Sequence, residues 1–376
     1  MKYKIALFKG DGVGPELIAE GKKVLEKAAE LDKFELEWIE HPHSAEHFLE
    51  TKRLIDLKTI DEIRKTCNAV YCGTFGDPRV EIQILEKGIL GSLKEHLGQF
   101  ISLKPVKLFP EVESYIRDKT HNDVNFTMIR ENSEDMYVGL HGRAKNQRSR
   151  QPFEFNKGAA KAKLSLNIEL KGGEIAYQVG ILSSKRCEAI AKFAFEYAKG
   201  NGINKITSID KVNELGYYSI WREAMDAMSK NYGISLEFEL IDAAVMNFVR
   251  QPEKYRLIVV PNMFGDILSD LSNMIQGGLS FSSIANINPE GISMFEPSHG
   301  SAPMLKDKGV VNPIATIIAG AMMLDSLNQK KSSSLIMRSI ESVLRDGKTR
   351  TQDLDGRNTT SDMGSAIMEK FVELHE

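Results

Sequence analysis

Two aspartates four residues apart, Asp266 and Asp270, have the type and spacing that can bind a divalent cation. They follow the apolar run Leu257–Val260, which is typical of a buried strand, and we expect Gly265 to break that segment and a helix to open at Asp266. Residues four apart share one side of a helix, where two carboxylates repel each other unless a cation lies between them. Oxygen ligands favour Mg²⁺ or Mn²⁺ over Zn²⁺. A metal site is one interpretation, and an ordinary helix N-cap at Asp266 is the other.

Three further polar residues follow segments with a strand-like or polar pattern. Asp242 lies at the end of the strand-like stretch 236–241 and is a third candidate metal ligand. Lys211 follows the strand-like stretch 206–210, and Tyr137 follows a polar stretch. Lysine and tyrosine become acid or base groups when burial or neighbouring charge shifts their pKa values. A surface lysine and a packed tyrosine are the alternative interpretations.

The glycine-rich turn after the first strand does not fit a Rossmann dinucleotide site. That fingerprint is G-x-G-x-x-G, whereas the glycines here stand at 10, 12 and 14 and Pro15 follows. Asp11 would also repel a pyrophosphate at the N-terminus of the next helix. We interpret the segment as a strand-to-helix turn with proline at the first helical position.

A zinc-protease pattern, H-x-x-E-H, occurs at His43, Glu46 and His47. Ser44 is a good N-cap for a short helix over 45–49, which would leave His43 outside the helix and spoil the one-sided ligand geometry. A zinc hydrolase built on these residues therefore remains a minor alternative, which would require zinc to co-purify.

The elements that must position these residues alternate between strand and helix patterns. Residues 4–8, 34–39, 69–73 and 257–260 resemble strands, and apolar residues over 16–31 recur at helical spacing. This order predicts an α/β fold whose sheet is covered by helices on both faces.

The composition restricts the class of protein. The chain has 376 residues, which exceeds one ordinary hydrophobic core, and we expect two domains. Its net charge of −3 argues against a nucleic-acid partner, and no apolar run reaches the roughly 20 residues of a membrane helix. Three cysteines without a CxxC spacing and the lack of a secretory signal indicate a reducing, cytoplasmic location. The sequence predicts a cytosolic α/β enzyme or binding protein.

A basic and polar segment, 142–173, differs from its surroundings. Residues 161–170 alternate, Gly172 and Gly173 follow, and 174–179 has a second strand-like pattern. We expect a hairpin arm over about 142–180, either a solvated loop or an arm that interlocks with a second subunit.

Five motifs in order resemble the β-decarboxylating dehydrogenase family of isocitrate, 3-isopropylmalate, homoisocitrate and tartrate/D-malate dehydrogenases. They run nearly from end to end of the chain and are GDGVGPE at 10–16, IRENSEDMY at 129–137, DKVN at 210–213, NMFGDILSD at 262–270 and FEPSHGSAP at 295–303, with VNP at 311–313. The resemblance implies the two-domain isopropylmalate-dehydrogenase-like fold, with a cofactor domain that is not a Rossmann domain and an active-site cleft between the domains. It implies a large cofactor-binding domain over 1–102 and 277–376 and a small dimerisation and metal domain over 103–276.

The resemblance also implies a homodimer with interlocking arms and shared active sites, in which Lys211 and Asp242 enter from the neighbouring subunit. Asp242, Asp266 and Asp270 would hold Mg²⁺ or Mn²⁺, which acts as a Lewis acid during hydride transfer to NAD and loss of CO₂. Lys211 would take the hydroxyl proton, Tyr137 would reprotonate the enol, and Arg130 would bind a substrate carboxylate.

Several positions depart from the family pattern and leave the substrate open. Lys94 and Lys104 stand where the family has arginines for the malate carboxylates, so charge is kept but the bidentate fork is lost. Leu90 matches the isopropylmalate pattern, whereas Lys87 replaces its usual glutamate and could pair with an extra acidic group or be a solvated residue. The substrate is expected to be a small hydroxy acid, namely isocitrate, homoisocitrate, 3-isopropylmalate, tartrate or D-malate.

The resemblance favours NAD over NADP. Relatives that use NADP bind its 2′-phosphate through a Lys-Tyr pair and a later Tyr and Arg, and here Met304, Leu305, Gln352 and Gly356 occupy those positions. The cofactor-binding residues implied are Asn213, Glu296, His299, Gly300, Ala302, Asn312 and Asp353. The alternative function is a non-catalytic regulatory subunit of a hetero-oligomeric isocitrate dehydrogenase, which the lysines at 94 and 104 favour and the retained Tyr137, Lys211 and aspartates do not.

Overall fold

A computed structural model describes residues 1–145, 148–156 and 160–376, which form two compact units. Unit 1 comprises residues 1–125 and 271–376, and unit 2 comprises residues 126–270. These units end at residues 125 and 270, whereas the expected boundaries follow 102 and 276. Strand β4 (Ile101–Lys107) pairs with β13 (Ser283–Ile287), for example Leu103 with Ala285, and so belongs to unit 1.

Unit 1 alternates strands and helices from its first residues, as the sequence predicts. Its other strands are β1 (Lys2–Gly10), β2 (Glu35–His41), β3 (Ala69–Thr74) and β14 (Met294–Pro297). Its helices are α1 (Gly14–Asp32), α2 (Ala45–Thr51), α3 (Leu57–Thr66), α4 (Ile82–Leu85), α5 (Ser92–His96), α10 (Ile314–Ser326), α11 (Lys330–Asp346) and α12 (Thr360–His375). A π-helical turn, Glu86–Gly91, joins α4 to α5.

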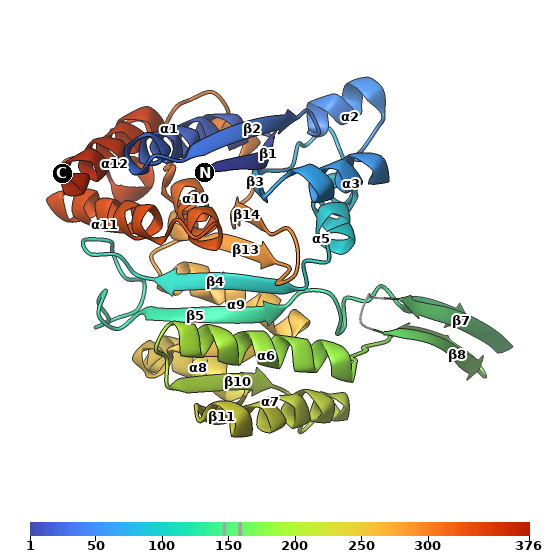
Figure 1. Ribbon diagram of the computed structural model, residues 1–376. Helices are drawn as coiled ribbons and strands as arrows, with labels where there is room; N and C mark the ends of the chain where they lie inside the picture. Colours follow the sequence, from blue (N-terminus) through green and yellow to red (C-terminus); the bar gives the residue numbers. More distant parts are fainter. Residues whose placement is uncertain (146–147, 157–159) are drawn as a thin grey trace. The chain divides into compact units, whose positions relative to one another are not determined.

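The strands of unit 1 lie in the order β2-β1-β3-β14-β13-β4. Strand β1 is parallel to β2 and β3, β14 is parallel to β3, and β13 is antiparallel to both of its neighbours. Side chains on β1 alternate between two faces, and both faces are buried. Phe8 packs in a cluster with Ile63 and Leu93 of the helices that follow, whereas α1 and α10 contact the sheet and each other (Figure 1). Helices therefore cover both faces, as predicted.

The turn after β1 is a strand-to-helix connection, with Pro15 in the first turn of α1 as predicted. The Asp11 carboxylate accepts hydrogen bonds from the backbone N–H groups of Ala45, at 2.7 Å, and Gly76, at 3.1 Å. Burial raises the pKa of Asp11 above its ordinary value. Gly12 has φ +58°, and a Cβ there would lie 1.9 Å from the carbonyl oxygen of Ser301, so this turn requires glycine.

The long apolar run near the C-terminus forms α10, which is buried along almost its whole length. A helix buried all round is expected to be apolar on every side. Among the described residues, no helix is both long and apolar enough to cross a membrane.

The described residues of unit 2 form a four-stranded sheet, two two-stranded ladders and four α-helices. The strands are β5 (Asn125–Glu131, which begins one residue before the boundary), β6 (His141–Lys145), β7 (Arg148–Asn156), β8 (Lys161–Glu169), β9 (Glu174–Gln178), β10 (Lys205–Asp210), β11 (Ser235–Leu240) and β12 (Leu257–Val260). The helices are α6 (Ser184–Gly200), α7 (Ser219–Tyr232), α8 (Ile241–Arg250) and α9 (Asn262–Ile275), whose last residues belong to unit 1.

The sheet of unit 2 is parallel, in the order β5-β12-β10-β11. Helices α6 and α7 pack against each other (Figure 1). In parallel strands the carboxyl ends lie at one edge of the sheet. The residues that follow β5, β10 and β12 include Tyr137, Lys211 and Asp266, so the topology of unit 2 places the chemistry-bearing segments at that edge.

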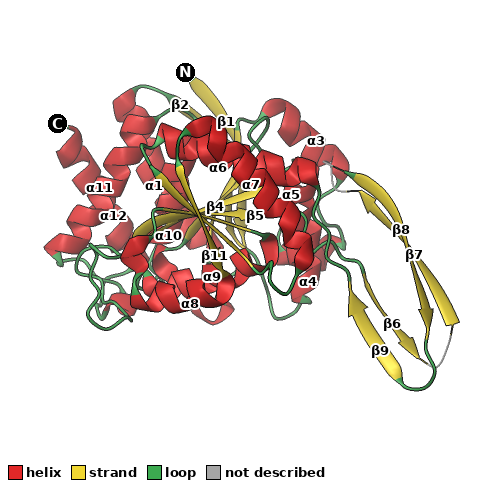
Figure 2. Cartoon of the chain, turned by 90° about the horizontal axis from the view of Figure 1, so that it is seen from below, coloured by secondary structure: helices red, strands yellow, loops and turns green. Residues whose placement is uncertain are grey.

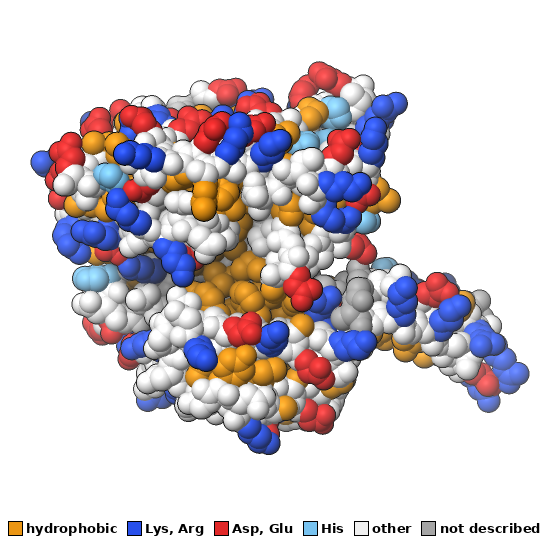
Figure 3. Space-filling view, in the orientation of Figure 1, with side chains coloured by type: hydrophobic (Ala, Val, Ile, Leu, Met, Phe, Trp, Pro, Cys, Tyr) orange, Lys and Arg blue, Asp and Glu red, His pale blue; other side chains and the backbone are white. Residues whose placement is uncertain are grey.

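The described residues of the expected arm form two antiparallel two-stranded ladders. Strand β8 pairs with β7, and β9 pairs with β6, so Gly172 and Gly173 do not join two mutually paired strands (Figure 2). Lys and Arg side chains lie along the β7–β8 ladder together with acidic ones (Figure 3), as in the ion pairs Arg148–Glu169 and Lys163–Glu154. Part of the expected arm, 146–147 and 157–159, lies outside the described residues.

Candidate active site

Arg130, Tyr137 and Asp266 form a compact polar cluster in unit 2. Arg130, on β5, donates from Nη1 to Oδ1 of Asp266 at 2.7 Å, and the Tyr137 hydroxyl donates to Oδ2 at 3.0 Å. Partial burial, and then the hydrogen bond to the Asp266 carboxylate, raise the pKa of Tyr137 above its ordinary value. A tyrosine held in its protonated form beside a carboxylate can donate a proton to a nearby carbanion or enolate.

Asn262 and Gly265 determine where the Arg130 guanidinium lies. Asn262 Oδ1 accepts from Arg130 Nε at 2.9 Å and Nη2 at 2.7 Å, and its Nδ2 donates to the carbonyl of Glu134 at 3.1 Å. A Cβ on Gly265 would lie 2.6 Å from Cγ of Arg130. The expectation that Gly265 ends the strand and that the helix opens at Asp266 is therefore wrong. Helix α9 already begins at Asn262, and the glycine inside it makes room for the arginine.

Asp266 and Asp270 are both exposed on α9, one helical turn apart, as their spacing predicts. The interpretation of Asp266 as an N-cap is wrong, because it lies in the second turn of the helix. Their carboxylate oxygens are the donors that Mg²⁺ or Mn²⁺ prefers. Among the described residues of one chain, no group of three or more His, Cys, Asp or Glu side chains lies together as a metal site.

Lys211 and Asp242 form an ion pair in unit 2. Lys211 follows β10, and the hydrogen bond from its ammonium lowers the pKa of Asp242. Asp242 does not lie at the end of a strand as expected, because β11 ends at Leu240 and α8 starts directly after it, with Asp242 in its first turn. The base candidate and the third ligand candidate are therefore neighbours within one chain.

Asp210 was not identified from the sequence, although it fixes the backbone that carries Lys211. Its buried carboxylate accepts from the N–H of Val212 at 2.9 Å and from two guanidinium nitrogens of Arg222, at 2.6 and 3.0 Å. A charge-assisted pair of this kind is strong and directional. An aspartate directly before a candidate lysine was the available sequence signal.

Lys94 and Glu296, both in unit 1, form an ion pair with Nζ 3.1 Å from Oε1. The same oxygen of the buried Glu296 accepts from Asn286 Nδ2 at 2.8 Å. A lysine that replaces an arginine at this position therefore has an anionic partner within the protein. A substrate carboxylate would compete with Glu296 for the ammonium.

Lys104 is only 1% exposed, and its ammonium donates to Oδ1 of Asn273 on α9. Asn273 is a further residue that sequence reasoning missed. The other two expected substrate residues lie on the segment between α4 and α5. Lys87 is exposed and Leu90 is half-buried against the apolar cluster beneath it. π-helical turns occur often at functional sites.

The expected cofactor residues of unit 1 lie on β14 and the loop after it, just before α10, and in the short 3-10 turn at 352–354. Asn312 donates from Nδ2 to Asp353 at 3.0 Å, and its Oδ1 accepts the N–H of Ile314 at the start of α10. Ala302, with φ +38°, and the exposed Gly300 belong to the loop after β14.

His299 lies in that same loop, and burial lowers its pKa. Its Nε2 is buried without a hydrogen-bond partner among the described residues. A buried polar atom without a partner is costly unless a ligand or water satisfies it, and this fits a dinucleotide contact there. Asn213, also expected at the cofactor, lies exposed in the loop after β10 of unit 2.

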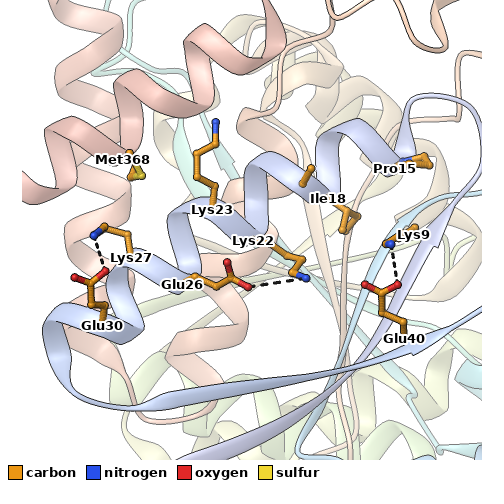
Figure 4. A pocket seen from close by; sticks show the side chains of 11 residues that line it. Lys9, Pro15, Ile18, Lys22, Lys23, Glu26, Lys27, Glu30, Glu40 and Met368 are labelled. Atoms are coloured by element: carbon orange, nitrogen blue, oxygen red, sulfur yellow. Dashed lines mark hydrogen bonds and ion pairs between the residues drawn. The ribbon is translucent and has the colours of Figure 1, made fainter.

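A groove of about 620 Å³ on unit 1 contains none of these residues (Figure 4). Its floor is α1, and its lysines face carboxylates, as in the pairs Lys9–Glu40 at 2.7 Å and Lys22–Glu26 at 3.9 Å. We interpret it as a solvated, charge-balanced surface.

The two histidines of the zinc-like pattern, His43 and His47, lie close together in unit 1, with His41 and Phe8 beside His43. Ser44 caps α2 through the N–H of His47, as predicted, and His43 precedes the helix. The ring centroids of His43 and His47 are 5.3 Å apart, and those of His41 and His43 are 6.2 Å apart. Burial, and then the charges of His47 and His41, lower the pKa of His43 to about 4.

This cluster predicts a loss of stability in mild acid. The unfolded chain takes up a proton on His43 near pH 6.5, whereas the folded protein does not until about pH 4, so stability falls as the pH drops through that window. After allowance for partial exposure, we expect His43→Phe to remove on the order of 1 kcal/mol of the loss between pH 7 and pH 5. Urea unfolding of both proteins at the two pH values measures it, and equal losses would contradict the assignment.

The chain is similar to known dehydrogenases along nearly its whole length. The profile of the isocitrate/isopropylmalate dehydrogenase family matches residues 4–367. The chain is 34% identical over 379 residues to the decarboxylating D-malate dehydrogenase of Escherichia coli (strain K12), with 97% of each chain covered. It is 31% identical over 374 residues to the 3-isopropylmalate dehydrogenase of Thermobifida fusca (strain YX), with 98% of each covered. The isocitrate dehydrogenase structure from Methylococcus capsulatus matches with a TM-score of 0.80 at 28% identity, over 98% of this chain and 99% of that one.

These matches and the α/β fold define a dehydrogenase. The chain belongs to the isocitrate/isopropylmalate dehydrogenase family. It is therefore a hydroxy-acid dehydrogenase of the oxidatively decarboxylating kind, from a family that generally uses NAD and a divalent metal.

Proposed function

We propose that this protein oxidatively decarboxylates a substituted malate with NAD and Mg²⁺ or Mn²⁺. The observation that carries the proposal is the cluster of Arg130, Tyr137 and Asp266, with Asp270 one turn further along α9. It combines a carboxylate-binding cation, a protonated acid and two metal-type carboxylates in one unit.

Each side chain has a defined task in this proposal. Arg130 binds a carboxylate of the substrate, and Asn262 keeps its guanidinium in one orientation. Lys211 accepts the proton of the substrate hydroxyl, and Tyr137 donates a proton to the carbon that loses CO₂. Asp242, Asp266 and Asp270 would hold the cation. When bound, the cation would polarise the hydroxyl oxygen and NAD would accept the hydride.

Two apolar helical stripes support the proposal of a homodimer with shared sites. On α8, Val245, Met246 and Val249 are exposed, and Asp242 lies on the same side of the helix at i, i+3, i+4, i+7 spacing. On α9, Ile267 and Met274 are exposed, with Asp270 between them on the same side.

An exposed apolar stripe of this kind indicates an interface. We propose that a second copy covers both stripes. Because each stripe carries an aspartate, packing α8 of one subunit against α9 of its mate would bring Asp242 to Asp270, and Lys211 would accompany Asp242.

Met246→Asp should therefore dissociate the dimer. Met246 is 64% exposed in one chain, and a charge there would remove its burial in both copies of a two-fold interface. We expect association to weaken on the order of 100-fold or more. Analytical ultracentrifugation should show the monomer, with activity lost in parallel. Tyr115→Asp, at a residue also 64% exposed but in a loop of unit 1, is the matched control and should stay dimeric.

The substrate is tested by NADH production with Mn²⁺ and isocitrate, homoisocitrate, 3-isopropylmalate, D-malate or tartrate, each also with NADP. We expect one acid to be turned over with NAD preferred. If Lys94 and Lys104 keep the family's substrate role, replacing both by arginine should raise turnover of an ordinary malate derivative. No NADH from any acid would refute the proposal and favour the non-catalytic subunit, whose specific support is that Glu296 and Asn273 already contact these lysines.

A further inference from the structure

Asp135 is a buried carboxylate that touches neither metal ligand of α9 directly but contacts the first turn of that helix. Its Oδ2 accepts the backbone N–H of Met263 at 2.8 Å. Its Oδ1 accepts the hydroxyls of Tyr217, at 2.5 Å, and Tyr218, at 2.9 Å. Asp135 is 0% exposed, and among the described residues no lysine or arginine pairs with it.

Contact with the first turn of α9 explains why the charged carboxylate of Asp135 is tolerated in a buried position. The first N–H groups of a helix have no partner within the helix and carry partial positive charge. Asp135 satisfies one of them from a distant part of the chain, as an N-cap residue would. The two tyrosine hydroxyls complete the hydrogen bonding of a carboxylate that has left water.

The backbone of Asp135 is held as firmly as its side chain. Its φ is +70°, which a residue with a side chain adopts only where its surroundings impose it. Its N–H donates to the carbonyl of Ile181 at 2.7 Å, and its own carbonyl accepts from the N–H of Ile181 at 3.2 Å. This turn directs the chain onward to Tyr137, two residues later, which contacts Asp266.

We propose that Asp135 is a positioning residue that fixes the start of α9 relative to Tyr137. It thereby sets the separation between the proton donor, Tyr137, and the metal-type carboxylate of Asp266. Arg130 depends on the same arrangement, because its partner Asn262 is the first residue of α9 and donates to the carbonyl of Glu134, next to Asp135. The inference rests on the proposed function and extends it to a residue that touches no substrate.

Glu134 provides a matched control. It is equally buried, lies one residue earlier, and its carboxylate accepts from the N–H and Oγ of Ser183, both at 2.7 Å. Those bonds secure the start of α6, which carries none of the predicted site residues. Asp135→Ala and Glu134→Ala therefore each remove one buried carboxylate that holds a helix start, but only the former loosens α9.

The experiment compares Asp135→Ala, Asp135→Asn and Glu134→Ala with the unmodified protein. We measure kcat, KM for the acid, the Mn²⁺ concentration that gives half-maximal rate, and hydrogen exchange of the amides at 263–266 in the metal-free protein. Loss of a residue that orients metal ligands typically costs about 10- to 100-fold in metal affinity or activity.

We expect Asp135→Ala to raise the Mn²⁺ requirement about tenfold, lower kcat, and speed exchange at 263–266. Asp135→Asn, which keeps an acceptor oxygen, should restore most of each property, and Glu134→Ala should leave the Mn²⁺ requirement unchanged despite lower stability. Equal shifts in the two alanine variants, or none in Asp135→Ala, would overturn the proposal. If Asp135→Ala does not fold, the same quantities are measured in Asp135→Asn and in a variant in which phenylalanine replaces both Tyr217 and Tyr218. Should the unmodified protein oxidise none of the acids, the proposed function fails, whereas the exchange data still decide whether Asp135 holds α9.

Discussion

Lys211→Met should reduce kcat by about 10³-fold while NAD binding and dimerisation persist. The neutral amine of Lys211 is the proposed acceptor of the substrate's hydroxyl proton, and methionine keeps the length of the side chain without a titratable group. The partner Asp242 is largely exposed, so loss of the ion pair should cost little stability. Steady-state rates and NAD titration by fluorescence separate chemistry from binding.

Lys205→Met is the matched control for that change. Lys205 also lies on β10 and forms an exposed ion pair with Glu237 at 2.5 Å. Its replacement should leave kcat within a factor of about two, as expected for a surface ion pair. An active Lys211→Met enzyme would remove Lys211 from the mechanism, and an inactive Lys205→Met enzyme would show that the effect is not specific.

Asp270→Asn should raise the Mn²⁺ concentration for half-maximal rate by about 100-fold or more, because a direct ligand loses its charge. Asn keeps the shape of the side chain, so folding should be preserved. Asp226→Asn, on α7 and paired with Lys230 at 2.7 Å, is the control acid in the same unit and should not alter the metal titration. An unchanged titration of Asp270→Asn would refute its assignment as a ligand.

Mixing the two inactive proteins tests whether the site is shared. In a heterodimer of Lys211→Met and Asp270→Asn subunits, one site receives both intact residues and the other receives both replacements. Random reassortment of subunits should then restore about a quarter of the original activity. Sites formed within single chains would give no recovery on mixing.

The periodic parts of the fold could be predicted from the sequence. Helix α1, the buried strands and the turn before Pro15 follow from apolar spacing and proline placement. The start of α9 could not, because the group that caps it, Asp135, is more than a hundred residues away in the chain. Asp242 was misplaced since α8 follows β11 without an intervening loop residue, and apolar Ile241 suits either element.

The partners of individual side chains were harder to predict from the sequence than the helices and strands. The sequence identified Lys104 as a departure from the family, but not that strand pairing would bury it beside Asn273. The pairing of β8 with β7, and of β9 with β6, could not be predicted, because the alternation of residues indicates a strand but not its partner. Motif resemblance predicted which groups react, whereas the contacts that Asn262, Asp210 and Asp135 make to neighbouring segments became evident only from the structure.

The close packing of Arg130 against Gly265 affects how mutational scans of this protein should be interpreted. Any side chain there would collide with the aliphatic stem of Arg130, so even alanine should be rejected as strongly as loss of an aspartate. A position that tolerates no substitution is therefore not necessarily a residue that takes part in the reaction. Libraries that seek a new substrate preference should leave residue 265 fixed and vary residues 87 and 90, where the exposed and half-buried side chains leave room for change.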